Sequence, residues 1–406
     1  MNQVKPIITA IICAIAFHGC TCEDMVVQEV YGPSDKTKRA YYLLGDNTAE
    51  TGFSPLTIGS AGNSMFFLEP PAAVYLNPAR IGDYTDAEKF SLNAGMNWFS
   101  SIVYGYETGD RQGRVTDRTQ FFSLPPLFNG GGCFRIHGPL SAGIGVNPIR
   151  DFYFAHDVED YHNTTGFSEH IYRYSHESHG GLYGGSIGLC LDIFKGLSVG
   201  SSGTFMYGKA VFDYPLTPNG RAILWGFGVT AGAEYKTRVF RDSYKGTAYA
   251  LRFRYSDWVN LDIERPYFAP EESGEYRLRY PYEIAASALI KYTDNYFELK
   301  MASVIPPRVY IESFDNDIFS PFLNTTYSWG LSYEKSLAPN EAMRMGLSFY
   351  NDGRVNVGFG RSFFNAQDKL IFDLGVGIGF DKESTHIAFA AGIEAIDIED
   401  KIQTNE

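Results

Sequence analysis

From Phe90 onward, apolar side chains alternate with small or polar ones, which is the period-two pattern of β-strands. In Ile223–Tyr235 the odd positions carry Ile, Trp, Phe, Val, Ala, Ala and Tyr, whereas the even positions carry Leu, Gly, Gly, Thr, Gly and Glu. Leu370–Phe380 alternates in the same way, with glycines and Asp373 on the polar face. Each segment therefore has one apolar, aromatic face and one face rich in glycine.

The alternation predicts fourteen strands. They cover residues 90–107, 118–127, 132–147, 179–192, 196–210, 222–237, 244–259, 279–292, 295–304, 324–336, 342–351, 354–363, 370–380 and 385–397. Short connections, such as those near Asn129-Gly130 and Lys195-Gly196, alternate with longer ones such as residues 148–178. This alternation is typical of outer-membrane barrels, in which short turns face the periplasm and long loops face outward. We therefore predict an all-β fold, a 14-stranded antiparallel transmembrane β-barrel over residues 90–398, with both termini on the periplasmic side.

Composition favours a membrane barrel over a soluble β-sandwich. The chain has 42 Gly, 28 Tyr and 31 Phe in 406 residues, while its mean hydropathy is only -0.18. Only alternate residues of a barrel face lipid, so aromatic content is high while hydropathy stays near neutral. The formal net charge of -13 argues against a nucleic-acid partner, because nucleic-acid binding requires a basic surface.

The N-terminus has the pattern of a secretory signal over residues 1–22. Lys5 precedes the apolar run Ile7–Phe17, which is too short to span a bilayer as a helix. Gly19-Cys20 fits the end of a lipoprotein signal, whereas Phe17 and His18 do not, so lipidation of Cys20 stays an open alternative. We expect an exposed lead segment over residues 23–44, a C-terminal tail over residues 399–406, and export to the outer membrane.

The stretch Gly59–Ile81, GSAGNSMFFLEPPAAVYLNPARI, is the most distinctive part of residues 45–89. Gly59 and Gly62 permit close backbone approach, and Pro78 fixes its own φ while disfavouring a helical Asn77. The stretch therefore predicts either a compact plug or an ordinary proline-rich loop before the barrel.

The same stretch resembles the N-terminal hatch of the FadL/OmpP1/TodX outer-membrane transporters, their spirochaetal relatives and the PorV-type barrels. A Gly-x-Ala-Gly start is followed by Asn-Pro-Ala-x-Ile and then by a barrel strand. The positions that match the pattern are Gly59, Ala61, Gly62, Asn77, Pro78, Ala79 and Ile81. In place of the acidic residues in the middle of the FadL hatch stands Leu68-Glu69-Pro70-Pro71.

The resemblance implies a hatch, residues 45–89, folded into the lumen. It implies diffusive uptake of hydrophobic small molecules, such as long-chain fatty acids, through a barrel surrounded by outer-membrane lipid. Phe66, Phe67, Val74 and Tyr75 would line the pocket or gate. Asn77 and Pro78 would hold the hatch against the wall, with Asn77 bonded to strand backbone. The alternative is a non-transporting scaffold or secretion shuttle, like PorV, that binds periplasmic or surface proteins.

Strand parity places Arg252 and Arg254 inside the barrel. Two inward arginines are suited to binding a carboxylate head group, because guanidinium groups pair with carboxylates bidentately. The alternative is a structural ion pair with an inward acid: Glu283, Glu298 or Asp373.

Two further features concern the wall. Asn147-Pro148 falls near the end of the predicted third strand, where the resemblance implies an inward kink and proline by itself implies only a strand end. Cys133 and Cys190 are expected to face the lumen on adjacent strands, where a disulfide is chemically permitted in an oxidising periplasm.

Residues 150–180 contain five of the eight histidines: His156, His162, His170, His176 and His179. No HExxH spacing occurs, so we predict a solvated external loop and no metal site. Gly196-Leu197-Ser198-Val199-Gly200 matches G-x-S-x-G but lies within a predicted strand, which a nucleophile elbow does not allow. We predict no enzyme activity and no cofactor.

Overall fold

The computed structural model describes most of the chain after residue 45. The described ranges are 46–47, 52–62, 64–86, 88–103, 127–152, 154–164, 168–194, 196–213, 220–237, 245–256, 258–264, 276–279, 282–305, 308–311, 318–319, 325–338, 340–351, 353–365, 369–380 and 384–398. The expected signal peptide, lead segment and C-terminal tail lie outside these ranges.

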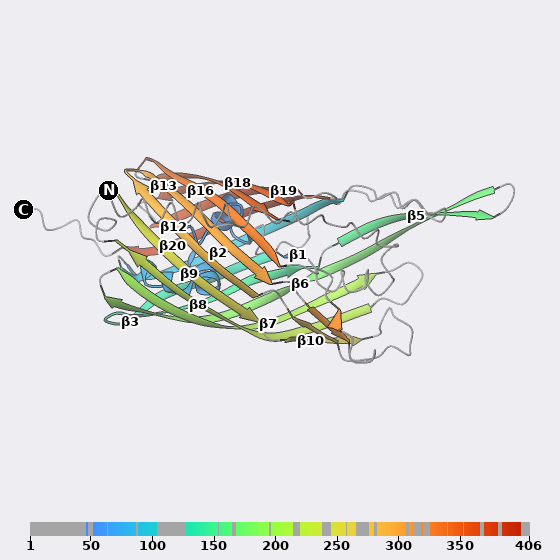
Figure 1. Cartoon of the computed structure of the whole chain (residues 1–406), viewed down its shortest axis with the longest axis horizontal. Helices are drawn as coiled ribbons and strands as arrows, with labels where there is room; N and C mark the ends of the chain where they lie inside the picture. The colour runs from blue at the N-terminus through green and yellow to red at the C-terminus, as the bar shows by residue number, and fades with distance from the viewer. Residues whose placement is uncertain are drawn as a thin grey trace, which may run out of the picture. The chain divides into compact units, whose positions relative to one another are not determined.

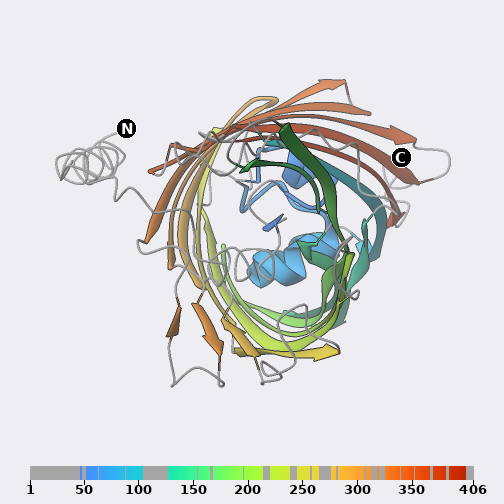
Figure 2. The ribbon, with the colours of Figure 1, turned by 90° about the vertical axis from the view of Figure 1, so that its right-hand side faces the viewer.

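Fourteen antiparallel strands form a closed barrel, as the alternation predicts (Figure 1, Figure 2). Each strand pairs with the next along the wall, and the last pairs with the first. The strands are β2 (Glu88–Val103), β3 (Leu127–His137), β4 (Leu140–Asp151), β6 (Ser168–Phe194), β7 (Leu197–Asp213), β8 (Gly220–Lys236), β9 (Lys245–Ser256), β12 (Tyr282–Tyr292), β13 (Asn295–Ile305), β16 (Thr326–Ala338), β17 (Glu341–Tyr350), β18 (Val355–Asn365), β19 (Leu370–Phe380) and β20 (Ser384–Ile398).

Six further strands extend this wall. They are β1 (Asp46–Asn47), β5 (Phe154–Thr164), β10 (Trp258–Glu264), β11 (Tyr276–Arg279), β14 (Arg308–Ile311) and β15 (Ile318–Phe319). β1 pairs with the end of β4, and β5 pairs with the first half of β6. The histidine-rich segment that we predicted as a loop therefore forms a β-hairpin of β5 and β6. β10, β11 and β14 pair with one another or with β8 beyond the ends of the main strands.

The two ends of the barrel differ. Glu88 at the start of β2 pairs with Ile398 at the end of β20, so both chain ends leave the wall at one rim. The short turns that join β3 to β4, β6 to β7 and β12 to β13 lie at this rim, and the longer connections lie at the other. By the usual polarity of such barrels, the rim with the short turns is periplasmic and the opposite rim is external.

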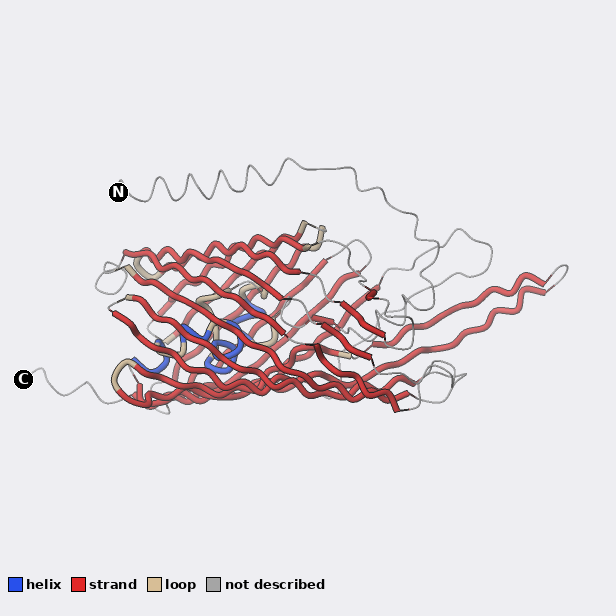
Figure 3. Tube along the Cα trace, turned by 60° about the horizontal axis from the view of Figure 1, so that its bottom comes forward, coloured by secondary structure: helices blue, strands red, loops and turns tan. Residues whose placement is uncertain are grey.

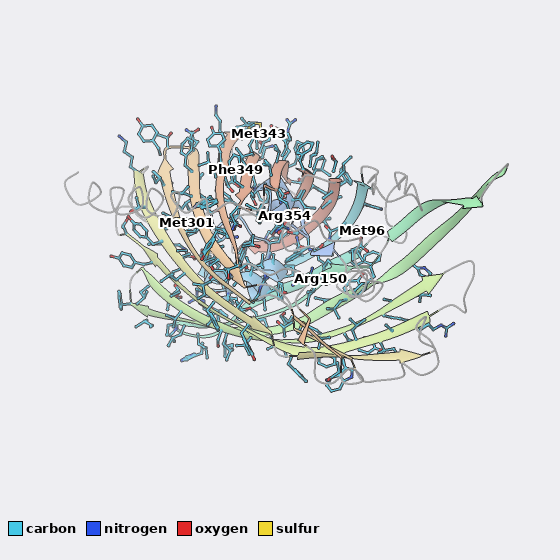
Figure 4. The ribbon with its side chains drawn as sticks, turned by 45° about the vertical axis from the view of Figure 1, so that its right-hand side comes forward. Met96, Arg150, Met301, Met343, Phe349 and Arg354 are labelled. Carbon is cyan, nitrogen blue, oxygen red and sulfur yellow. The ribbon has the colours of Figure 1, made fainter. Side chains whose placement is uncertain are left out.

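The outer surface of the wall is apolar. Ile187, Leu251 and Phe227 are 69%, 58% and 57% exposed, and they alternate with buried neighbours. Met96 and Phe349 belong to the same outer belt, whereas Arg150 is buried on the inner side (Figure 4). A continuous apolar belt on a closed barrel matches a lipid environment, in which every strand needs a bonded neighbour.

The first hairpin differs from the sequence prediction. The predicted third strand, 132–147, crosses a turn at Gly138-Pro139, because β3 ends at His137 and β4 begins at Leu140. Gly138 has φ 53°, a conformation that glycine adopts without strain. Asn129-Gly130, predicted as a turn, lies inside β3. Most of the predicted strand 118–127 lies outside the described residues.

Residues before β2 form a hatch inside the barrel (Figure 2, Figure 3). It contains α4 (Pro55–Gly59), α5 (Pro70–Leu76), the 3₁₀ turn η1 (Pro78–Arg80) and α6 (Asp83–Asp86). Both longer helices begin with proline, and Ser54 caps α4 through its side chain. No helix among the described residues is long and apolar enough to cross a membrane.

Candidate functional site: the hatch and the lumen

Helix α4 lies directly on the glycines of the inner wall. A Cβ built on Gly358 would lie 2.1 Å from the Ile58 carbonyl oxygen, and one on Gly375 would lie 2.4 Å from the Pro55 carbonyl oxygen. A Cβ on Gly346 would lie 2.1 Å from the Ser60 carbonyl carbon. These distances leave no room for a side chain, so the glycine-rich inner face lets the hatch backbone contact β17–β19.

Hydrogen bonds fix the end of α4 to the same wall. Ala61 and Gly62 have φ 57° and 70°, which turns the chain after the helix. The Ser348 hydroxyl then donates to the Ala61 carbonyl oxygen at 2.7 Å, and Ser332 donates to the Ser60 carbonyl oxygen at 3.4 Å. Gly59, Ala61 and Gly62 of the predicted motif therefore all serve this docking.

Glu298 of β13 holds the next part of the hatch. Its carboxylate accepts hydrogen bonds from the Ser64 hydroxyl at 2.5 Å, the Met65 amide at 2.7 Å and the Ser287 hydroxyl at 2.6 Å. Glu298 is fully buried, and these three donors replace the water that a carboxylate would otherwise bind. This inward acid is thus bonded to the hatch and not to Arg252 or Arg254.

The Asn-Pro-Ala part of the motif lies against β7 and β8, but not through the bond we predicted. The Asn77 side-chain amide donates to the Met65 carbonyl oxygen of the hatch at 3.1 Å, so the predicted bond to strand backbone is wrong. A Cβ on Gly200 would lie 2.4 Å from Pro78, and the Cys190 thiol donates to the Ala79 carbonyl oxygen at 3.2 Å. Pro78 and Ala79 therefore rest directly on the wall.

The side chain of Asn147 makes a hydrogen bond between the barrel wall and the hatch. Its buried amide donates to the Pro71 carbonyl oxygen of α5 at 2.9 Å. Beyond Pro148 the register of β4 with β6 shifts by one residue at Ile149, and pairing with β3 stops after Val146. The prolyl residue thus marks a β-bulge inside β4, where we had weighed a kink against a strand end.

An ionic cluster joins the hatch to β8 near the periplasmic rim. Arg80 lies 2.9 Å from the Asp83 carboxylate and 3.6 Å from that of Glu234. Lys236 contacts Asp83 and lies 3.3 Å from Glu234. Arg80 of η1 and Lys236 of β8 therefore each lie beside the same two carboxylates, Asp83 of α6 and Glu234 of β8.

Glu69 connects the two helices of the hatch. It precedes α5, and its carboxylate accepts from the Ser54 hydroxyl and from the Leu56 amide, the latter at 2.6 Å. Burial, and then the nearby charge of Asp373, raise the pKa of Glu69 from 4.5 to about 7. The hatch thus contains a carboxyl group that titrates near neutral pH.

The four residues predicted to line a pocket fall into three separate apolar clusters. Phe66 and Phe67 pack against small wall residues such as Ala250 and Ala285. Val74 packs with Ile81, Cys133 and Cys190. Tyr75 belongs to the largest cluster. That cluster consists of Phe53, Leu68, Ala72, Ala73, Tyr75, Leu76, Ile149, Phe152, Leu182, Met206, Ala210, Ala222, Leu224 and Val259.

Arg252 and Arg254 face the lumen, as parity predicts, and both pair with Glu283. Arg252 contacts this carboxylate directly, and Arg254 and Lys300 lie 3.1 Å and 3.5 Å from it. The Arg254 guanidinium also lies 5.4 Å from the centre of the Tyr75 ring. Three cations therefore surround one carboxylate beside the hatch.

The Cys133–Cys190 disulfide that the sequence permits is not formed. Both cysteines are free and buried, and they lie on β3 and β6, which are separated by β4. Two strand spacings amount to about 9.5 Å, beyond the Cα separation that a disulfide spans. The error comes from the missed turn at Gly138-Pro139, which made the two strands seem adjacent.

Sequence reasoning missed several residues of this site. Lys300 lies two residues after Glu298 on β13, so the alternation of the strand predicts that it also faces inward. Glu69 appeared only as a departure from the family pattern. The contact between Arg80 and Glu234 had no signal in the sequence, because it depends on where the hatch lies. Among side chains that the structure describes, no group of three or more His, Cys, Asp or Glu is arranged to hold a metal.

Comparison with known proteins identifies the fold. No family model and no curated protein sequence matches the chain. The solved structures similar to it include the CymD monoaromatic hydrocarbon channel, with a TM-score of 0.55 and 15% identity over 86% of this chain and 99% of that one. The Pseudomonas putida toluene transporter TodX gives a TM-score of 0.58 and 12% identity, covering 84% and 97%.

A Pseudomonas aeruginosa FadL homologue gives a TM-score of 0.57 and 11% identity, covering 86% of this chain and 98% of the other. Together with the apolar outer belt, these neighbours point to the bacterial outer membrane. This chain has the fold of the FadL/TodX/CymD-type outer-membrane channels, a fourteen-stranded barrel whose lumen holds an N-terminal hatch.

Proposed function

We propose that this chain carries hydrophobic small molecules, long-chain fatty acids among them, across the outer membrane through a hatch-gated barrel. The observation that carries the proposal is the juxtaposition, beside Tyr75, of apolar wall residues and a cluster of three cations. The solved channels of the same fold include one described as a toluene transporter and one as a monoaromatic hydrocarbon channel, which supports a hydrophobic ligand.

The apolar lining lies on the half of the wall farther from the periplasmic turns. Leu182, Met206 and Leu224 are buried on the inner faces of β6, β7 and β8, and they belong to the same cluster as Tyr75 and Leu76 of the hatch. An acyl chain would reach this surface when the hatch moves away from it, because the three side chains are at most 3% exposed. Burying it there is favourable by about 25 cal/mol per Å² of apolar surface.

The cations are suited to the head group. Arg252, Arg254 and Lys300 lie together around the carboxylate of Glu283, and guanidinium and ammonium groups in such a cluster are suited to bind the carboxylate of a ligand. Arg252 also donates to the Leu76 carbonyl oxygen at 3.4 Å, and Thr230 donates to that of Tyr75 at 3.0 Å. A ligand that re-orients these side chains would loosen the end of α5 and begin to release the hatch.

Competition between palmitate and hexadecanol tests the head-group site, because the two ligands share an alkyl chain and differ in charge. For the full-length barrel, purified and stripped of lipid, we expect palmitate to bind about tenfold more tightly, the effect of one charge-assisted hydrogen bond. Arg254→Gln should reduce the ratio to near one. Arg361→Gln, a change at an exposed residue of β18, is the matched control and should leave it unchanged.

Two results would contradict the proposal. Equal affinity of the unaltered chain for both ligands would remove the role of the cations while leaving hydrophobic transport intact. No saturable binding of either ligand, together with a protein that co-purifies with the barrel, would instead favour the scaffold or secretion shuttle.

A further inference from the structure

The inner face of β2 and β3 carries three asparagines whose side chains are buried. Asn93 and Asn97 lie on β2 and Asn129 lies on β3, and none of them is more than 6% exposed. They alternate with exposed apolar residues of the outer belt, such as Met96. Because the side chains of a strand point to alternate sides, all three amides point into the lumen, where the hatch lies.

Most of the hydrogen-bonding atoms of these amides have no partner. Asn97 Nδ2 donates to Asn129 Oδ1 at 3.3 Å. The other four atoms are buried without a hydrogen-bond partner among the described residues: both amide atoms of Asn93, Oδ1 of Asn97 and Nδ2 of Asn129. Exchanging nitrogen and oxygen in both members of the bonded pair, or in Asn93, leaves four unpaired atoms again.

The neighbouring part of the hatch offers these amides little to bond. Gly131, the residue opposite Asn93, pairs with Gly145 of β4. A Cβ on Gly145 would lie 3.0 Å from Pro71, so the start of α5 rests on the wall beside the asparagines. Helix α5 begins with two prolines, which have no N–H to donate. The carbonyl oxygen of Pro71 already accepts from Asn147.

Other parts of the wall are bonded to the hatch. Side chains of β4, β8, β13 and β17 each donate to it or accept from it. The three asparagines make no such bond among the residues that the structure describes. A buried donor or acceptor without a partner costs the desolvation of that group, and water supplies the partner once the hatch withdraws. The contact along β2 and β3 is therefore less favourable than the contacts elsewhere.

We propose that the hatch separates from the wall first along β2 and β3, where Asn93, Asn97 and Asn129 then form the polar side of a water-filled opening. The amides present both donors and acceptors, so the opening admits water and small hydrophilic solutes. The bonds to β8, β13 and β17 lie elsewhere on the wall and hold the hatch while this side opens. The inference rests on the hatch movement of the proposed function but not on which molecule is carried.

Ion conductance of the full-length barrel in a planar bilayer with KCl measures this opening without a ligand. Asn93→Leu keeps the branching of the side chain but removes both unpaired atoms, so we expect the conducting fraction of time to fall about tenfold. Asn93→Asp places a charge directly opposite Glu394 and should raise this fraction. Ser348→Ala removes a hydroxyl that is bonded to Ala61 of the hatch and should also raise it.

Asn93→Ala separates the loss of the amide from a simple blockage of the lumen by a larger side chain. It removes the same two atoms without adding volume, so the conducting fraction should again fall. Amide protons of α5 should exchange more slowly in both variants, while protected β-strand amides verify that the barrel is folded.

An unchanged or raised conducting fraction in Asn93→Ala would overturn the inference, because the asparagine would then not oppose docking of the hatch. That result would leave the proposed uptake standing, since the competition between palmitate and hexadecanol tests uptake through a different part of the wall.

Discussion

At the scale of single residues, Glu69 shows how one buried carboxylate organises the hatch. It bonds to Ser54 and Leu56 at the start of α4 while standing at the start of α5. The sequence marks this position only as a departure from the family pattern. The structure gives it a role, since the charge of Glu69 decides how firmly the two helices are held together.

Hatch docking should depend on pH through Glu69. The pKa of Glu69 is raised in the docked state, so protonation of Glu69 stabilises docking. This contribution to the free energy of docking is fully present below about pH 4.5 and is lost as the pH rises through about 7. The shift corresponds to about 3 kcal/mol. We expect amide protons of α4 to exchange faster at pH 8 than at pH 5, after correction for intrinsic exchange.

Glu69→Gln should flatten this pH dependence, because glutamine does not titrate. Glu341→Gln, which removes a partly exposed carboxylate at the barrel rim, should retain it. If Glu69→Gln preserves the full pH dependence, another group is responsible, and Asp373 on β19 is the neighbouring carboxyl group to examine.

At the scale of elements, the glycine-rich inner face acquires a specific meaning. Alternation by itself correctly predicted which residues face inward, because side chains of a strand point to alternate sides. It did not explain why so many of them are glycine. Helix α4 supplies the reason: its backbone contacts Gly346, Gly358 and Gly375, and any Cβ there would displace it.

Gly358→Ala should therefore weaken hatch docking. Overpacking of this kind typically costs about 1–3 kcal/mol, which corresponds to about 5- to 150-fold in the population of undocked hatch. Ion conductance across a planar bilayer should rise accordingly, because an undocked hatch opens the lumen. Gly203→Ala is the matched control, since a Cβ on Gly203 meets nothing within 4 Å. Equal conductance of the two variants would contradict the packing argument.

For the whole molecule, the proposed route through the lumen requires the hatch to move. The Thr85 and Ser141 hydroxyl oxygens lie 2.8 Å apart, one on α6 and the other on β4. Thr85→Cys combined with Ser141→Cys should form a disulfide under oxidising conditions and tether the hatch to the wall. Palmitate uptake into vesicles should then fall by at least about tenfold, and a reducing agent should restore it.

Thr85→Cys alone is the control, because it changes the same residue without a partner thiol. Undiminished uptake by the oxidised double variant would show that the ligand passes without release of α6. Such a result would leave the proposed uptake standing but would remove hatch movement at α6 from it.

Period-two alternation is a local property of each strand, so the chain alone predicted a closed barrel of about fourteen strands and the side chains that face inward. Which lumen residues meet depends on how the hatch and the strands pack together. Arg252 and Arg254 are paired with Glu283, and Asn147 binds α5, because the hatch and the wall strands bring together residues far apart in the chain. Because the prediction missed the turn at Gly138-Pro139, it placed Cys133 on a strand next to that of Cys190.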